Sequence, residues 1–158
     1  MKLTAAEEYG LRIVVRIAAS DGLTTIGEIA EGEGLTVPYV AKLTGVLRRA
    51  GMIRTVRGKA GGLELARSAD RLPVADVLQA LGGTLFPSGF CEGHSGGRRV
   101  CANDTDCSIR TLWTVLDAAV SRILSQLYVS DLLCTERQME RLLERRASAR
   151  LPMLPETS

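Results

Sequence analysis

The chain is poor in aromatic side chains and in histidine. Phenylalanine, tryptophan and tyrosine make up 4% of its 158 residues, and there is one histidine. Aliphatic side chains on helices must therefore supply most of the core. No apolar run approaches the roughly 20 residues of a membrane-spanning helix, and no hydrophobic signal segment follows Met1, so we expect a cytoplasmic protein. The absence of a phosphate-binding loop and of a nucleophile–base–acid set argues against an enzyme.

The chain also has no large excess of charge of one sign, since its net charge is only +2. The charges are nevertheless unevenly distributed along the sequence. Residues 1–35 carry three basic and six acidic side chains, whereas residues 36–71 carry eight basic and two acidic ones. A local basic block of this kind is typical of proteins that bind a polyanion such as DNA. A solvated basic face would have the same composition, so the charge pattern alone leaves both interpretations open.

The first part of the chain has the element order of a winged helix-turn-helix. Two capping boxes, Thr4 with Glu7 and Thr25 with Glu28, each predict the start of a helix. Two short β segments on either side of a glycine-rich tip predict a hairpin. The fold class expected is therefore mainly α with a small β-hairpin. The predicted elements are helices over 5–20, 26–31 and 36–50, a hairpin over 53–66 and a helix over 73–81.

The second part begins with a glycine- and polar-rich loop and continues into a long helix, predicted over 108–132. Apolar residues at helical spacing give this helix one continuous stripe. A stripe on a projecting helix needs a partner, most simply the same helix of a second subunit, although packing on its own domain stays open. The stripe consists of Ile109, Leu112, Trp113, Leu116, Val120, Ile123, Leu124 and Leu127.

These patterns divide the chain into four parts. A winged helix-turn-helix DNA-binding domain is expected over 1–86, and a cysteine-rich loop follows over 87–107. Dimerisation helices are expected over 108–147, and residues 148–158 form a tail.

DNA contacts are predicted at the start of the helix over 36–50 and at the hairpin tip. The second helix of a helix-turn-helix places its N-terminal residues against base edges in the major groove. A cation on a hairpin tip suits a narrow minor groove, whose negative potential attracts it. A winged helix can also bind proteins, so the fold alone does not establish DNA binding. The predicted DNA-binding residues are Thr36, Pro38, Tyr39, Lys42, Arg57 and Lys59.

Three of the four cysteines, Cys91, Cys101 and Cys107, lie within seventeen residues of the loop. Clustered thiols in a reducing compartment favour metal or redox chemistry over a structural disulfide. An iron–sulfur cluster takes thiolate ligands. The same thiols with His94 would make a Cys₃His zinc site, and bare thiols could sense oxidants by forming a disulfide. The fourth cysteine, Cys134, is predicted to be a buried core thiol.

Several segments resemble the Rrf-two family of bacterial winged-helix regulators. The most specific is VRGKAGGLELAR at 56–67, where a wing pattern RGxxGG is followed by LAR. The segment TVPY at 36–39 and the pair Leu112-Trp113 after the cysteines add to the resemblance, which extends to residue 135. It implies a homodimeric transcription factor whose three cysteines hold an iron–sulfur cluster that controls DNA binding. The gap between the first two cysteines is longer than usual in the family, so two-iron and four-iron clusters both stay open.

The resemblance also bears on the fourth cluster ligand. The cluster assembly regulators of the family have a histidine three residues after the third cysteine, where this chain has Arg110. The nitric-oxide-sensitive repressors use an acidic residue in the first helix of the other subunit, and Glu8 falls at that position. Glu8 is therefore the predicted fourth ligand, because a capping role already explains Glu7. The implied function is repression controlled by nitric oxide, redox state or iron; the alternative is a zinc-containing DNA-binding protein without cluster sensing.

Overall fold

The computed structural model describes residues 4–58, 60–82, 101, 103 and 105–148. Lys59, Cys91 and His94 lie outside the described residues. The described part is mainly helical with one two-stranded antiparallel hairpin, which confirms the predicted fold class. Its elements are α1 (Ala5–Ala19), α2 (Ile26–Glu33), α3 (Val37–Arg49), β1 (Ile53–Val56), β2 (Gly62–Leu65), η1 (Ala69–Arg71), α4 (Val74–Ala80), α6 (Ser108–Ser125), η2 (Val129–Leu132) and α7 (Glu136–Ser148).

Both predicted capping boxes are present. Thr4 N–H donates to the Glu7 carboxylate at 2.6 Å, and Glu7 N–H donates back to the Thr4 hydroxyl at 3.3 Å. Thr25 and Glu28 repeat the arrangement at the start of α2. The hydrogen bonds from Thr25 hold the pKa of Glu28 below its ordinary value, because they stabilise the charged carboxylate. Local sequence therefore fixes where α1 and α2 begin.

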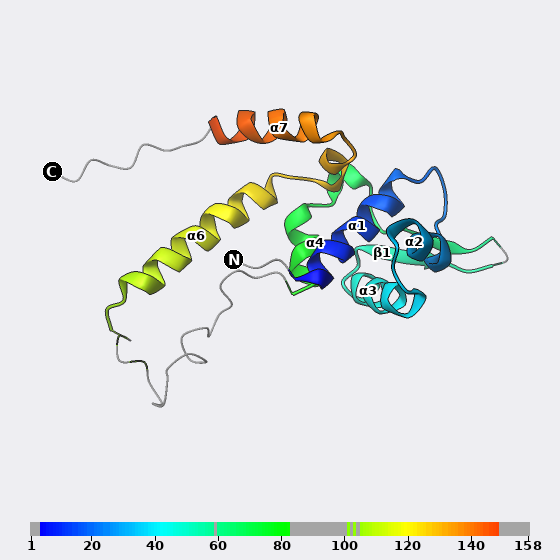
Figure 1. Cartoon of the computed structure of the whole chain (residues 1–158), viewed down its shortest axis with the longest axis horizontal. Coiled ribbons are helices and arrows are strands. Elements are labelled where there is room, and N and C mark those ends of the chain that lie inside the picture. The colour runs from blue at the N-terminus through cyan, green and yellow to red at the C-terminus, as the bar shows by residue number, and fades with distance from the viewer. Residues whose placement is uncertain (1–3, 59, 83–100, 102, 104, 149–158) are drawn as a thin grey trace.

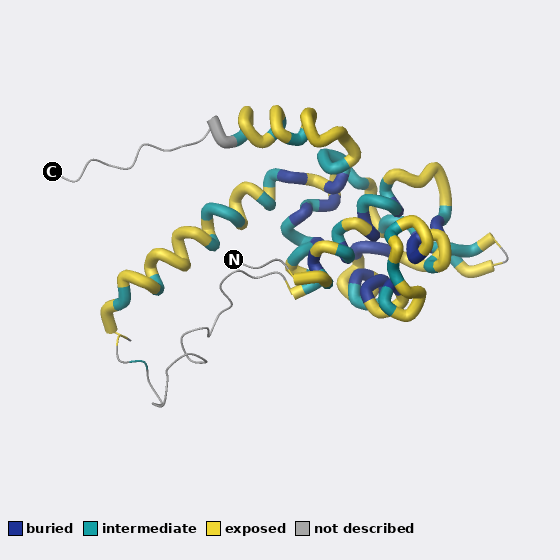
Figure 2. Tube along the Cα trace, in the orientation of Figure 1, coloured by how far each residue is buried: buried dark blue, intermediate teal, exposed yellow. Residues whose placement is uncertain are grey.

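The core lies where α1, α2 and α3 meet the hairpin, and its side chains are aliphatic apart from one methionine (Figure 2). This composition agrees with the scarcity of aromatic residues. Among the described residues, no helix has the length and hydropathy needed to cross a bilayer. The core residues are Ile13, Val14, Ile17, Ile29, Ala30, Val40, Leu43, Leu47, Met52, Ile53, Leu63, Leu72, Val77 and Val129.

The hairpin is held against the helices by a short third segment. β1 and β2 pair antiparallel with Thr55 opposite Leu63, and Thr24 forms a bridge to Leu63 from the other side. Thr24 N–H donates to the Leu63 carbonyl at 3.0 Å, and Leu63 N–H donates back at 2.8 Å. Thr24 is 7% exposed, and its hydroxyl oxygen has no hydrogen-bond partner in the part of the chain that the structure describes.

We expect Thr24→Val to raise the free energy of unfolding by about 1 kcal/mol, because it replaces an unsatisfied buried hydroxyl with a methyl group of the same shape. Denaturant unfolding measures the change. Thr25→Val is the matched control: it deletes the capping hydroxyl of α2 and should lower the stability by about 1 kcal/mol. A loss of stability in Thr24→Val would show that the hydroxyl has a partner in the folded protein.

After α6 the chain returns to the segment that precedes α4. Val74 N–H donates to the Leu127 carbonyl at 2.8 Å, and Val129 N–H donates to the Leu72 carbonyl at 2.9 Å. Leu127 and Val129 are both buried. The predicted helix over 108–132 is therefore wrong at its end, because α6 stops at Ser125. The segment that follows is extended, places alternate residues in the core and forms backbone hydrogen bonds with residues 72–74.

α6 and α7 extend away from the bundle that α1 to α4 form with the hairpin (Figure 1). No residue of α6 is buried. The prediction for Cys134 is also wrong: this residue is exposed between η2 and α7, and its thiol donates to the Asp131 carbonyl at 3.0 Å. Arg146 holds α7 in place by pairing with the Asp131 carboxylate at 3.2 Å.

Candidate nucleic-acid interface and metal centre

The start of α3 presents polar groups to solvent. Thr36 is the N-cap, but its side chain makes no capping hydrogen bond, so its hydroxyl is left for another partner. Thr36, Pro38 and Lys42 are exposed. Pro38 has no N–H, and the N–H groups of Tyr39 and Val40 donate to the Thr36 carbonyl at 3.0 and 3.1 Å. The Thr36 hydroxyl and the Lys42 ammonium are therefore the groups that this end of α3 offers to DNA phosphates.

The ring of Tyr39, by contrast, is half-buried and fixed by α1. It packs edge-on against Tyr9 with ring centroids 6.1 Å apart and an interplanar angle of 85°. The Arg12 guanidinium lies over the other ring of the pair, 5.9 Å from the centroid of Tyr9. The position of Tyr39, and with it the start of α3, therefore depends on α1.

A second contact connects α1 to α2. The carboxylate of Glu33, whose side chain is 10% exposed, accepts from Arg12 at 2.8 Å and from Arg16 at 3.2 Å. The turn that follows α2 starts at Gly34, whose φ of 64° is in the left-handed region that favours glycine. These contacts make α1, α2 and the start of α3 one unit.

The hairpin tip carries cations on a tightly turned backbone. Arg57 is exposed, and Gly58 has a φ of 131°, which few side chains tolerate. A Cβ at Gly61 would lie 2.5 Å from the Val56 carbonyl oxygen, so the turn requires glycine there. The predicted hairpin is therefore confirmed, the DNA contact of Arg57 stays a prediction, and Lys59 lies outside the described residues.

The described cysteines of the loop lie at the start of α6. Cys107 is the N-cap of α6, and its sulfur accepts from Arg110 N–H at 3.4 Å. Cys101 and Cys107 are both half-buried. A thiolate at a helix N-terminus is stabilised by the helix dipole, so the local chemistry fits a soft metal centre. Within the described residues no three ligating side chains converge, and Cys91 lies outside them.

Glu8, the predicted fourth ligand, lies on the exposed side of α1. Its side chain is 52% exposed, and one oxygen is 3.9 Å from the Arg12 guanidinium. Glu7 is buried and forms the hydrogen bonds of the capping box, which agrees with the capping role assigned to it. Glu8 is therefore accessible to a second molecule.

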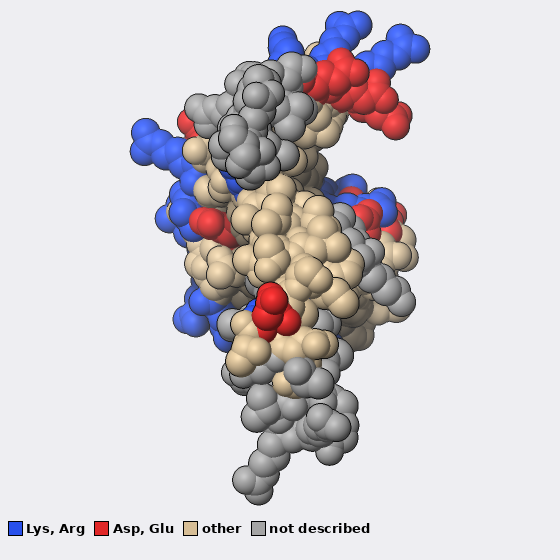
Figure 3. All heavy atoms as spheres, turned by 90° about the vertical axis from the view of Figure 1, so that its left-hand side faces the viewer, with Lys and Arg blue, Asp and Glu red and all other residues tan. Residues whose placement is uncertain are grey.

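Most of the apolar stripe of α6 is exposed, although Val120 and Leu124 are half-buried. Leu112 and Leu116 are 53% and 44% exposed, and Trp113 is 42% exposed. Figure 3 faces the side of the molecule on which α6 lies and shows a largely uncharged surface there. An apolar face of this kind on a soluble protein marks a contact with another molecule. The predicted stripe included Leu127, which is buried.

Residues 3–135 match the family described as Rrf2, iron-dependent transcriptional regulator. The chain belongs to the Rrf2 family. This match covers most of the chain and confirms the resemblance to the Rrf-two regulators that the wing and cysteine patterns indicated. The chain is therefore a DNA-binding transcriptional regulator and not an enzyme, as the sequence predicts.

Relatives agree with this assignment. The protein rrf2 of Nitratidesulfovibrio vulgaris is 36% identical over 135 residues, which span 84% of this chain and 87% of that protein. The transcriptional regulator IscR of Cereibacter sphaeroides is 31% identical over 140 residues, spanning 86% and 89% of the two chains. Both are similar to this Rrf2 chain over the winged helix and the segment that contains the cysteines.

Solved structures share the fold. CymR of B. subtilis, described as a global cysteine regulator, superposes with a TM-score of 0.68 at 27% identity and covers 84% of this chain and 96% of its own. IscR of T. potens superposes with a TM-score of 0.66 at 24% identity, covering 98% and 94%. These two solved structures thus share the fold of this chain.

Proposed function

We propose that this protein is a homodimeric repressor that binds duplex promoter DNA in the cytoplasm and whose DNA affinity is set by an iron–sulfur cluster. Cys91, Cys101 and Cys107 would supply three ligands from one protomer, and Glu8 of the partner subunit would supply the fourth. The signal would be nitric oxide, redox state or iron status. The resemblance to nitric-oxide-sensitive repressors supports repression and the assignment of Glu8.

One observation carries the proposal: Cys107 caps α6, and α6 carries the bare apolar face. A group held by Cys101 and Cys107 would therefore be fixed to the helix that is best placed to form the dimer. Three thiolates and one carboxylate suit a cluster that must react, because a harder oxygen ligand leaves its iron more exchangeable.

The DNA side of the proposal rests on exposure and charge. Thr36, Pro38 and Lys42 are exposed at the start of α3, and Arg57 is exposed near the hairpin tip. In a dimer, two such units would meet half-sites about one helical turn apart. Their relative placement would then decide how well both bind at once.

The contacts of α1 explain how Glu8 could influence α3. α1 carries Glu8 on its exposed side, and its Tyr9 packs against Tyr39 of α3. An ion pair between Arg12 and Glu33 connects α1 to α2. A contact from Glu8 to the partner subunit would fix α1, and α3 would be fixed with it. Loss of that contact would free the unit to shift relative to the partner, which is a rigid-body change of the kind that regulates many dimers.

The proposal is tested by the metal content of protein prepared without air. We expect iron and inorganic sulfide in a fixed molar ratio to the protein, together with absorption of visible light. A colourless preparation with one zinc ion per protein chain would favour the alternative, a Cys₃His zinc site that includes His94. The absence of iron, sulfide and zinc would contradict a metal centre of either kind.

A further inference from the structure

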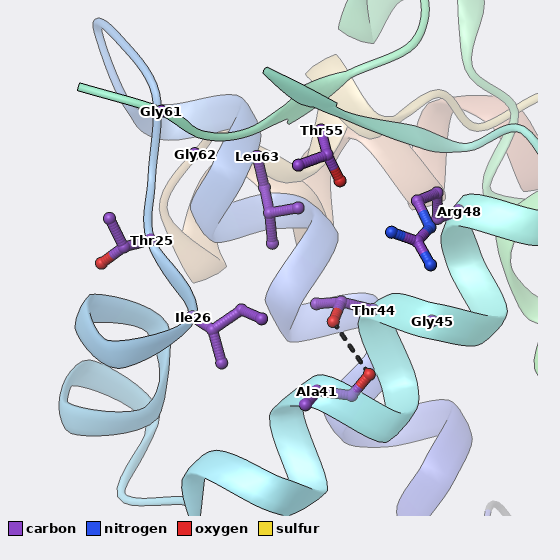
Figure 4. Close-up of a pocket in the computed structure, with 10 residues that line it drawn as sticks. All are labelled: Thr25, Ile26, Ala41, Thr44, Gly45, Arg48, Thr55, Gly61, Gly62 and Leu63. Atoms are coloured by element: carbon purple, nitrogen blue, oxygen red, sulfur yellow. Dashed lines mark hydrogen bonds between the residues drawn. The ribbon is translucent and has the colours of Figure 1, made fainter. Parts of the chain in front are cut away.

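A hollow of about 460 Å³ lies between α3 and the hairpin (Figure 4). Its walls come from the two elements that are predicted to contact DNA, α3 and the wing, and one end is closed by the start of α2. The lining includes the apolar side chains of Ile26, Ala41 and Leu63, and Thr25 lies at the α2 end. Figure 4 shows Arg48 and Thr55 near each other at the other end. The hollow therefore combines apolar walls with one cation and hydroxyl groups.

Gly45 is the most informative residue of the hollow. Glycine in a helix interior is destabilising relative to alanine, so its presence there calls for a reason. A Cβ at Gly10 or Gly32 would collide with Leu81 or Arg16, which explains those two glycines from within the molecule. A Cβ at Gly45 would meet only the Arg49 guanidinium at 3.6 Å, an ordinary contact. Among the described residues little else lies near the Cβ position of Gly45, so the backbone there is open to close approach by another molecule.

The polar groups of the hollow are of two kinds. The Thr44 hydroxyl donates to the Val40 carbonyl at 2.9 Å, and the Thr25 hydroxyl is engaged by Glu28 at 2.8 Å. Within the part of the chain that the structure describes, Arg48 makes no ion pair and Thr55 makes no side-chain hydrogen bond. Arg48 and Thr55 are therefore available to an external anion.

We propose that the hollow seats one sugar–phosphate unit of DNA, with the deoxyribose against Gly45 and the apolar walls and the phosphate bound by Arg48 and Thr55. This inference rests on the proposed function as a DNA-binding regulator. When α3 lies in the major groove and the wing in the adjacent minor groove, the strand that separates the two grooves must pass between them. A sugar–phosphate unit has an apolar part and an anionic part, which the apolar walls and the Arg48 guanidinium would accept.

Gly45→Ala tests the close approach. We expect a melting temperature equal to or above that of the wild type, because alanine favours the helix, and an affinity for duplex DNA lowered about tenfold, because the added methyl group obstructs the sugar. The probe is the duplex that the wild-type protein selects from a random pool. Gly27→Ala is the matched control: it also adds a methyl group to an exposed helical glycine without a clash, but outside the hollow, and should bind as the wild type does.

Arg48→Gln tests the phosphate contact. The slope of log affinity against log salt concentration should fall by about 0.9, the value for one lost phosphate contact. Arg137→Gln removes the same charge from α7, which lies away from α3 in Figure 1, and should leave the slope unchanged. A scan of the duplex with single neutral methylphosphonates should find one position at which Arg48→Gln costs no further affinity.

The inference is overturned if Gly45→Ala binds DNA as tightly as the wild type, or if Arg48→Gln keeps the full salt slope and no methylphosphonate position suppresses its effect. In those cases the DNA-binding function still stands, because the wild type and its controls bind. Failure of the wild-type protein to bind any duplex in a salt-dependent manner would overturn the proposed function and this inference together.

Discussion

Replacing both Leu112 and Leu116 with aspartate is expected to yield a folded monomer that binds duplex DNA at least about 100-fold more weakly than the wild type. Both side chains are exposed within one protomer, so the change removes no contact from the core. In the proposed dimer they would be buried, and unpaired carboxylates there would be costly. A monomer loses the second half-site and with it the gain from bivalent binding.

A control pair is available on the opposite side of the same helix. Thr114 and Ser121 are exposed and are also on α6, and at 100° per residue they lie across the helix from the leucine pair. Thr114→Asp with Ser121→Asp adds the same charge but should leave the dimer intact. Analytical ultracentrifugation gives the oligomeric state, and fluorescence anisotropy gives the DNA affinity. A leucine-to-aspartate variant that remains dimeric would place the dimer interface elsewhere.

The second large effect is expected from Cys107→Ser. This variant should lose the iron, the sulfide and the visible absorption of the anaerobic protein, because a hydroxyl is a poor ligand for the centre that thiolates hold. Serine is a preferred N-cap, so α6 should still begin at the same residue and the fold should survive. Loss of iron could then not be attributed to unfolding.

Cys134→Ser is the matched control for this variant, since Cys134 is exposed on a different segment and hydrogen-bonds only to the Asp131 carbonyl within the described residues. It should keep the full content of iron and sulfide. Iron and sulfide analysis and circular dichroism on the same preparations give both readouts. Retention of iron by Cys107→Ser would remove this residue from the ligand set.

Local patterns predicted those parts of the fold that local interactions determine. The capping boxes at Thr4 and Thr25 satisfy backbone groups within one helical turn, so the sequence there is sufficient to start a helix. The glycine-rich tip of the hairpin is a similar case, because the turn itself leaves no room for a side chain at Gly61.

Features that depend on distant segments were not predictable in the same way. Leu127 fits the apolar stripe of α6 by spacing, but it is buried because residues 72–74 pair with the segment that contains it. Cys134 lies after η2, beyond the buried segment, and is exposed. The importance of Gly45 emerged only when the space around its Cβ position could be compared with that around Gly10 and Gly32.

The most direct measurement is the affinity for duplex DNA at one fixed salt concentration, taken on a single anaerobic preparation before and after removal of the cluster. The proposed coupling of Glu8 and α1 to the partner subunit predicts affinities that differ by about tenfold or more, corresponding to the 1–3 kcal/mol typical of coupled sites. Equal affinities with and without iron and sulfide would contradict the account, even if the protein proved to be a cluster-containing dimer.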